Sequence, residues 1–403
     1  MTSKLSTMLL CIISAQSALC AEWEVQPYLL YTAELSDNRR LTIGETTETL
    51  GNLLTGGARL GVYTQTRRFY VEPAVVFRRY DKDSDLLDTD DSYLDLYFDN
   101  RSERSRFTFA GRYQRESTIT SEFAGADDGN PDLDDPVEDD TGDARISTRR
   151  DRLYLRPQWS YDISNRTAIV FGGGYTNVDY DEEPGLTLSG YDSSALDLSL
   201  RFRTSAKTTI GTRLLASVFE ADRTGNETDG TSLELTMRHN LSPQTTVNAS
   251  AGAFRSEATF LQDGSPTEGS ATDAIFRLGL TRNTELTDLT TSFRRTVSPS
   301  ALGSLKVRNQ LLFGIERRLS ERNSLIFNVR AYTSRSGAEE DNSSDRDYAR
   351  AELGFDRQLT RKLGFNLFYR YTAQERVAPG VNINDNAVLL SFGYRPQRLA
   401  MSR

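Results

Sequence analysis

The segment from Glu316 to Arg335 reads ERRLSERNSLIFNVRAYTSR, and its second half alternates between two kinds of side chain. The apolar residues share one parity: Leu325, Phe327, Val329 and Ala331. The polar side chains share the other: Asn328, Arg330, Tyr332 and Ser334. A period of two is typical of a β-strand, in which successive side chains point to opposite faces. The pattern therefore predicts a strand with an apolar phase on one side and water or partner charges on the other.

The same alternation recurs along the chain, for example in 153–161, 196–203 and 363–372. Many of these runs exceed the usual five or six residues of a globular strand. They approach the ~9–11 residues with which a tilted strand crosses a bilayer. Long alternating strands therefore favour a membrane-spanning sheet over a soluble sandwich, which would expose its edges.

The connections between these strands alternate in length. Eight are short and polar, such as HNLSPQTT and RRLSERNS, and nine are longer. The longer connections are expected at 36–50, 81–90, 118–145, 181–190, 222–230, 261–270, 298–302, 336–345 and 375–384. Seventeen connections separate eighteen strands, or sixteen if the weakest hairpin, between Ala271 and Val297, does not form. Because a sheet in lipid must close on itself, the fold class is an all-β, antiparallel, up-and-down transmembrane β-barrel.

The first 21 residues are typical of a secretory signal peptide. Lys4 provides a basic start, MLLCIISAQSALC is apolar, and Ala18 and Ala21 are small residues suited to cleavage. Residues 22–403 are then expected to form one barrel domain. Both cysteines, Cys11 and Cys20, lie in the leader, so the exported chain is expected to contain no disulfide. A lipid-anchored Cys20 is disfavoured because Leu19 precedes it where a small residue is needed.

Composition alone suggests a polar, acidic protein, with a net charge of -9 and 37% hydrophobic residues. After the leader, no run approaches the ~18 consecutive apolar residues of a membrane helix. The exported chain is therefore either soluble in the periplasm or inserted in the membrane as strands.

In architecture the chain resembles bacterial outer-membrane porin-like barrels over nearly all of its length after the leader. The first hairpin, YLLYTAELSDNRRLTIG, also resembles poorly characterised barrels associated with exopolysaccharide systems. The resemblance implies a Gram-negative outer membrane, with both termini and the short turns in the periplasm. It implies contacts with outer-membrane lipid and lipopolysaccharide, and with the barrel assembly machinery. One departure is that nine residues follow Tyr394, whereas such barrels usually end on an aromatic residue.

The polar faces carry arginines at similar depths in their strands. The predicted pore-lining arginines are Arg59, Arg112, Arg156, Arg213, Arg277, Arg330, Arg350 and Arg370. The carboxylates at similar depth are Asp95, Asp197, Glu234 and Glu352. This excess of positive charge predicts a lumen that favours anions. The alternative is that these side chains bond across neighbouring strands and only stiffen the wall.

The third long connection, SEFAGADDGNPDLDDPVEDDTGDAR, is the longest and strongly acidic. Its carboxylates are Glu122, Asp127, Asp128, Asp132, Asp134, Asp135, Glu138, Asp139, Asp140 and Asp143. In general porins the third loop folds into the lumen, and this resemblance implies a constriction. The alternative is a solvated surface loop, because runs of like charge usually remain in water. The spacing lacks the ligand pattern of an EF-hand, so no metal site is expected.

No enzyme is expected. His239 is the only histidine, and its parity places it on the lipid-facing side next to a short turn. No cysteine, phosphate-binding loop or zinc motif offers other chemistry, and no cofactor is expected. Nucleic-acid binding is also disfavoured, because the chain is acidic and its arginines are spread over many strands.

The sequence therefore predicts an outer-membrane channel, a porin or an exporter. Its solute would be a small anion or an acidic exopolysaccharide passing an arginine-rich lumen. The alternative is a non-conducting barrel that serves as a surface anchor or interaction module.

Overall fold

A computed structural model describes residues 21–43, 46–120, 148–181, 188–262, 265–300, 302–336, 345–376, 380–396 and 399–402. In this part of the chain eighteen strands form the wall of a barrel. They are β1 (Glu22–Ser36), β2 (Thr49–Tyr63), β3 (Arg67–Tyr80), β4 (Thr89–Arg101), β5 (Ser105–Ser117), β6 (Arg149–Asp162), β7 (Thr167–Tyr180), β8 (Tyr191–Arg203), β9 (Thr208–Ala221), β10 (Glu227–Ser242), β11 (Thr245–Gln262), β12 (Ser265–Asn283), β13 (Thr287–Ser300), β14 (Ser304–Ser320), β15 (Asn323–Ser336), β16 (Arg346–Gln358), β17 (Leu363–Arg376) and β18 (Val381–Tyr394). A helical turn, α2 (Ser84–Leu87), and a short strand, β19 (Leu399–Ser402), complete the elements.

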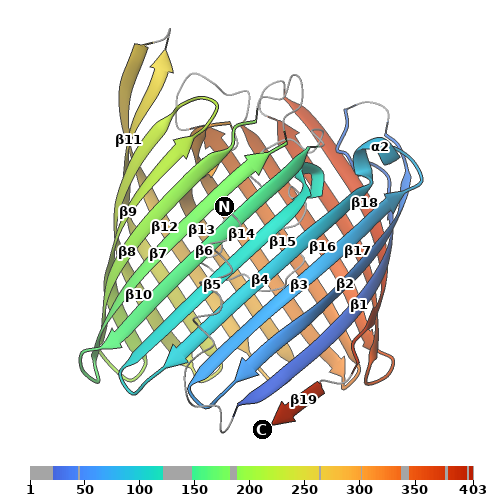
Figure 1. Ribbon diagram of the computed structural model, residues 1–403, viewed down its shortest axis with the longest axis horizontal. Coiled ribbons are helices and arrows are strands. Elements are labelled where there is room, and N and C mark those ends of the chain that lie inside the picture. The colour runs from blue at the N-terminus through green and yellow to red at the C-terminus, as the bar shows by residue number, and fades with distance from the viewer. Residues whose placement is uncertain are drawn as a thin grey trace, which may run out of the picture.

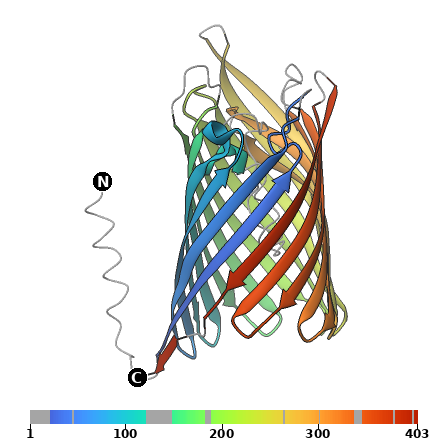
Figure 2. The same ribbon diagram turned by 90° about the vertical axis from the view of Figure 1, so that its right-hand side faces the viewer.

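Each strand pairs antiparallel with its neighbours in sequence, and the sheet closes where β1 meets β18. The closing register runs from Leu29 opposite Tyr394 to Ser36 opposite Ala387. The strands are strongly tilted, with the short turns at one end and the longer connections at the other (Figures 1 and 2). The predicted fold class and the count of eighteen strands are confirmed, and the alternative of sixteen is wrong.

The chain after Tyr394 adds one more strand to the closing seam. β19 pairs with the start of β1, from Glu22 opposite Ser402 to Val25 opposite Leu399. It lies at the short-turn end, beside the beginning of β1 (Figure 1). The segment that departs from the expected aromatic ending therefore extends the sheet.

The two faces of the wall have opposite chemistry. On β15, Leu325 and Phe327 are exposed on the outside, whereas Arg330, Tyr332 and Ser334 on the opposite face are buried. The outward tyrosines near the long-loop end donate to polar neighbours, as Tyr31 does to Asn52 (2.6 Å) and Tyr369 to Asn386 (2.7 Å). Amphipathic rings of this kind suit the boundary between hydrocarbon and head groups. Among the described residues no helix is long and apolar enough to span a bilayer.

Two of the expected long connections are wrong. The connection expected at 298–302 is a tight one, because β13 continues to Ser300 and β14 starts at Ser304. The connection expected at 261–270 is mostly strand, because β11 reaches Gln262 and β12 starts at Ser265. Glycine, serine and proline in these stretches suggested loops, and hairpin pairing overrode that local preference.

The β13–β14 connection depends on Gly303, whose φ of +77° lies in the left-handed region. A Cβ at this position would lie 2.5 Å from Thr224 Oγ1. A left-handed conformation costs a non-glycine residue about 1–2 kcal/mol. We therefore expect Gly303→Ala to lower the free energy of unfolding in detergent by about this amount. Gly174→Ala is the control, because nothing lies within 4 Å of its added Cβ; equal losses in both variants would contradict the assignment.

Candidate functional site: the charged inner face of the barrel

Side chains that alternate with the exposed apolar residues cover the inner face of the wall. All twelve predicted pore-lining residues occupy such inward positions in β2, β4, β5, β6, β8, β9, β10, β12, β15, β16 and β17. An eighteen-strand barrel is wide enough to leave an aqueous space unless chain fills it. The inner face is therefore the surface on which a solute would be selected.

A cavity of about 750 Å³ occupies the short-turn half of this inner face, along β6 to β12. Its cationic lining side chains are Arg156, Arg166, Arg201, Arg203, Lys207, Arg213, Arg238 and Arg277. Its carboxylates are Asp162, Asp197 and Glu234. Eight cations thus face three carboxylates in one concave space.

Arg213 is a cation of this cavity that has two carboxylates close by. Arg213 lies 3.4 Å from Asp197 and 4.0 Å from Glu234, as measured from guanidinium nitrogen to carboxylate oxygen. Arg201, Arg203 and Arg238 are exposed to the cavity, and none has an ion pair among the described residues. The sequence analysis missed these three, although Arg201 and Arg203 share the parity of Asp197. That shared parity is the signal that could have found them.

In the long-loop half of the inner face several charges are buried and paired with one another. Arg370 on β17 donates from Nε to Glu352 Oε1 (2.9 Å) and from Nη1 to Glu34 Oε1 (3.1 Å). Arg350 donates from Nε to the same Glu352 oxygen (3.0 Å). β18 lies between β17 and β1, and its inward Ala387 is small enough for Arg370 to reach across to Glu34. We call Glu34, Arg350, Glu352 and Arg370 the seam network.

The seam network continues into the loop after β1. Arg39 lies 3.5 Å from Glu34, and the Tyr80 hydroxyl donates to Glu34 Oε2 (3.2 Å). Burial lowers the pKa of Arg39, but Glu34, Tyr80 and Asp385 together outweigh that effect and raise the pKa above its usual value. The sequence analysis named Arg350, Glu352 and Arg370 but missed Glu34 and Arg39. No periodic signal identifies Arg39, because it lies outside the strands.

Other predicted arginines also have partners on neighbouring strands. Arg112 donates from Nε to Asp95 (2.6 Å), and Arg59 donates from Nε to Glu72 (2.7 Å), a carboxylate that the sequence analysis did not name. Arg330 lies 5.6 Å from the ring of Tyr332. At least five of the eight predicted arginines are thus in ion pairs. Cross-strand pairing therefore describes at least these five arginines, and the selective role of the set stays a prediction.

The stacked rings of Tyr332 and Tyr348 lie 4.9 Å apart on β15 and β16. The guanidinium of Arg308 lies 4.3 Å from the centre of the Tyr332 ring, and that of Arg346 lies 5.1 Å from it. Cations over aromatic faces are held at fixed positions by the ring quadrupole. Positive charge is therefore also ordered on the inner face of β14 to β16.

The remaining sequence predictions concern the acidic connection, the leader and His239. All ten predicted acidic residues, from Glu122 to Asp143, lie outside the described residues, as does the predicted leader up to residue 20. His239 Nδ1 lies 2.9 Å from Thr208 Oγ1, at the short-turn end of β9 and β10. In the described part of the chain, no group of three or more His, Cys, Asp or Glu side chains is placed to hold a metal ion.

No protein-family model and no curated protein matches the sequence. Several solved structures match over nearly the whole chain. OccK2 (OpdF) of Pseudomonas aeruginosa is 10% identical, with 93% of this chain and 98% of that chain aligned at a TM-score of 0.48. OccAB3 of Acinetobacter baumannii is 10% identical, with 94% and 99% aligned at 0.46. OpdK of P. aeruginosa, solved with vanillate, is 10% identical, with 94% and 99% aligned at 0.45. Identities of this size carry no information about the solute.

Proposed function

We propose that the protein is a channel of a Gram-negative outer membrane through which small anions pass. The observation that carries this proposal is the cavity along β6 to β12, where eight cationic side chains face three carboxylates. A channel wall selects ions by the charge that it presents at close range. A cavity of this size keeps a solute within the ~8 Å over which charges act at physiological ionic strength.

The outside of the barrel supports the membrane location. Large apolar side chains such as Leu235, Leu196 and Leu278 are more than half exposed on the outer face. In water such a continuous apolar surface would favour aggregation, whereas in a bilayer it faces hydrocarbon. Outer-membrane lipid and lipopolysaccharide are the proposed contacts of this face. The short turns, both ends of the described chain and β19 would then lie in the periplasm.

The solute class is tested by swelling of liposomes that contain the purified protein. Small monocarboxylates are expected to enter faster than neutral or cationic solutes of the same size. A short uronic-acid oligosaccharide is included, because the same arginines would attract an acidic exopolysaccharide. If no solute enters, the barrel is a non-conducting anchor and the channel proposal is wrong.

Neutralising the exposed cavity arginines is expected to weaken the preference for anions. In a triple variant, Arg201→Gln, Arg203→Gln and Arg238→Gln, five cations would face the three carboxylates. We expect the ratio of monocarboxylate to neutral-solute entry to fall several-fold, because the attraction depends on the net charge of the wall. The matched control is the triple Lys variant at the same positions, which keeps the charge and should keep the ratio. Equal ratios in the Gln and Lys variants would contradict the proposed role of the cavity.

A further inference from the structure

β12 and β13 separate above the middle of the wall. Their backbone pairing runs from Asn283 opposite Asp288 to Phe276 opposite Arg295 and includes no higher pair among the described residues. Above that point β12 stays paired with β11 as far as Ser265, and β13 stays paired with β14 as far as Ser300. The β11–β12 hairpin leaves the cylinder and projects beyond the rim (Figures 1 and 2). We call the space between the diverging strands the wedge.

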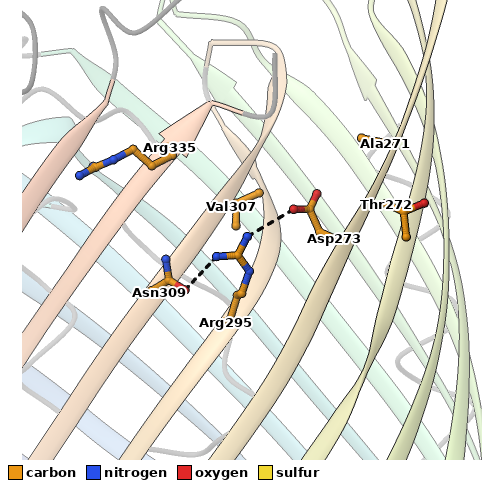
Figure 3. A pocket seen from close by; sticks show the side chains of 7 residues that line it. All are labelled: Ala271, Thr272, Asp273, Arg295, Val307, Asn309 and Arg335. Atoms are coloured by element: carbon orange, nitrogen blue, oxygen red, sulfur yellow. Dashed lines mark hydrogen bonds and ion pairs between the residues drawn. The ribbon is translucent and has the colours of Figure 1, made fainter. Parts of the chain in front are cut away.

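A pocket of about 290 Å³ lies in the wedge (Figure 3). From β12 it is lined by Ala271 and Asp273, which share the inward parity of Arg277, and by Thr272, which has the outward parity of Leu278. From β14 and β15 it is lined by Val307, Asn309 and Arg335, which share the outward parity of the exposed Leu311 and Leu325. An intact sheet separates its two faces, because successive side chains point to opposite sides. A pocket that combines inward positions of β12 with outward positions of β14 and β15 therefore marks a break in the wall.

Arg295 closes the lower end of the wedge. It is the last β13 residue paired with β12, and its Nε donates to the Ala274 carbonyl across the gap (3.0 Å). Its Nη2 reaches Asp273 Oδ1 (3.4 Å) and its Nη1 reaches Asn309 Oδ1 (3.2 Å), as Figure 3 shows. A side chain thus satisfies a backbone carbonyl where the ladder ends. The break has a defined, hydrogen-bonded edge.

The wedge begins in the outer part of the apolar band and extends beyond it. Arg295 is eight residues beyond Thr287, the first residue of β13, which places it about 20 Å above the short turns at ~3.3 Å per residue and a tilt of ~40°. The apolar band of such barrels is ~25 Å tall. Above Ala274 the outward positions of β12 are exposed and polar, with Thr272, Ser270 and Glu268 in succession. Unpaired strand edges are tolerated where water reaches them, and at the base of the wedge the Arg295 side chain donates to the Ala274 carbonyl in place of a strand partner.

We propose that the wedge is a side entrance, through which small polar solutes pass between the head-group layer and the lumen without crossing the mouth of the barrel. This proposal rests on the proposed channel function and adds a second route to it. Arg295 is paired with Asp273, and Arg335 with Asp345 and Asp347, so paired charges of both signs border the wedge and suit small polar solutes.

A reversible cross-link across the wedge tests the side entrance. If the ladder continued upward in its register, Ala274 would lie opposite Val297, so these are the positions for an Ala274→Cys and Val297→Cys pair. The control pair, Leu278→Cys and Phe293→Cys, lies in the paired part of the same two strands. Residues 21–403 contain no other cysteine. Each folded variant is treated with a short bis-methanethiosulfonate linker, linkage is verified by mass spectrometry, and monocarboxylate entry into liposomes is measured before and after reduction.

Linking Ala274→Cys to Val297→Cys is expected to slow entry several-fold, and reduction of the linker is expected to restore it. Liposomes that contain the control pair should admit monocarboxylate at the same rate with the linker intact and after its reduction. If the verified wedge cross-link leaves entry unchanged while the unlinked protein conducts, the side entrance is wrong and the channel stands. If the unlinked protein admits no solute, the channel itself is wrong.

Discussion

Replacing Arg370 with methionine is expected to lower the free energy of unfolding by about 3–5 kcal/mol, the usual consequence of removing one partner of a buried ion pair. Arg370 bridges Glu34 on β1 and Glu352 on β16, and all three side chains are less than 8% exposed. Its loss leaves two carboxylates with fewer partners at the seam where the barrel closes. Equilibrium unfolding in detergent micelles, followed by the fluorescence of Trp23 and Trp159, measures the change.

The matched control is Arg59→Met. Arg59 also pairs with a carboxylate on a neighbouring strand, at 2.7 Å from Glu72, but its side chain is 43% exposed. Water screens such a pair, so its loss should lower the free energy of unfolding by less than about 1 kcal/mol. Similar losses in the two variants would show that the seam network does not stabilise closure.

Reversing charge in the cavity is expected to reverse its ion preference. A triple variant, Arg201→Glu, Arg203→Glu and Arg238→Glu, would leave five cationic side chains facing six carboxylates. Ion selectivity follows the sign of the wall charge, so the channel should change from anion-favouring to cation-favouring. The reversal potential of single channels across a KCl gradient measures this change.

The substituted side chains face the cavity and have no ion pairs among the described residues, so the fold should tolerate them. The strand content and unfolding transition of the Glu variant serve as the check. An unchanged sign of the reversal potential in a folded, conducting Glu variant would mean that the cavity does not set selectivity.

Strand alternation predicted the fold because each side chain of a barrel faces either lipid or lumen. Leu325, Phe327, Arg330 and Tyr332 were assigned to the correct faces from parity alone, since a one-residue shift would place arginine in hydrocarbon. The hairpin of β11 and β12 was shortened in the prediction, because Gly264, Ser265 and Pro266 are typical of loops. In the structure, backbone pairing between β11 and β12 extends the hairpin to Gln262 and Ser265.

Parity could not reveal which inward charges meet. The Arg370–Glu34 pair joins residues 336 positions apart, and it depends on the closing register and on a small Ala387 between them. The wedge also could not be predicted from the sequence. Apolar and polar residues alternate normally in β12 and β13, and only the pairing of the two strands shows that they separate. The sequence pattern specifies which side chains share a face of a strand. The closure of the barrel and the register of its strands specify which side chains become neighbours across strands.

The reversal potential of the unmodified channel in a KCl gradient tests the central claim most directly. An aqueous lumen with an excess of cationic side chains predicts a potential whose sign is that of a chloride-selective pore, reduced in size as salt is raised because screening increases. A potential of the opposite sign, or the absence of conductance at every voltage, would contradict the account.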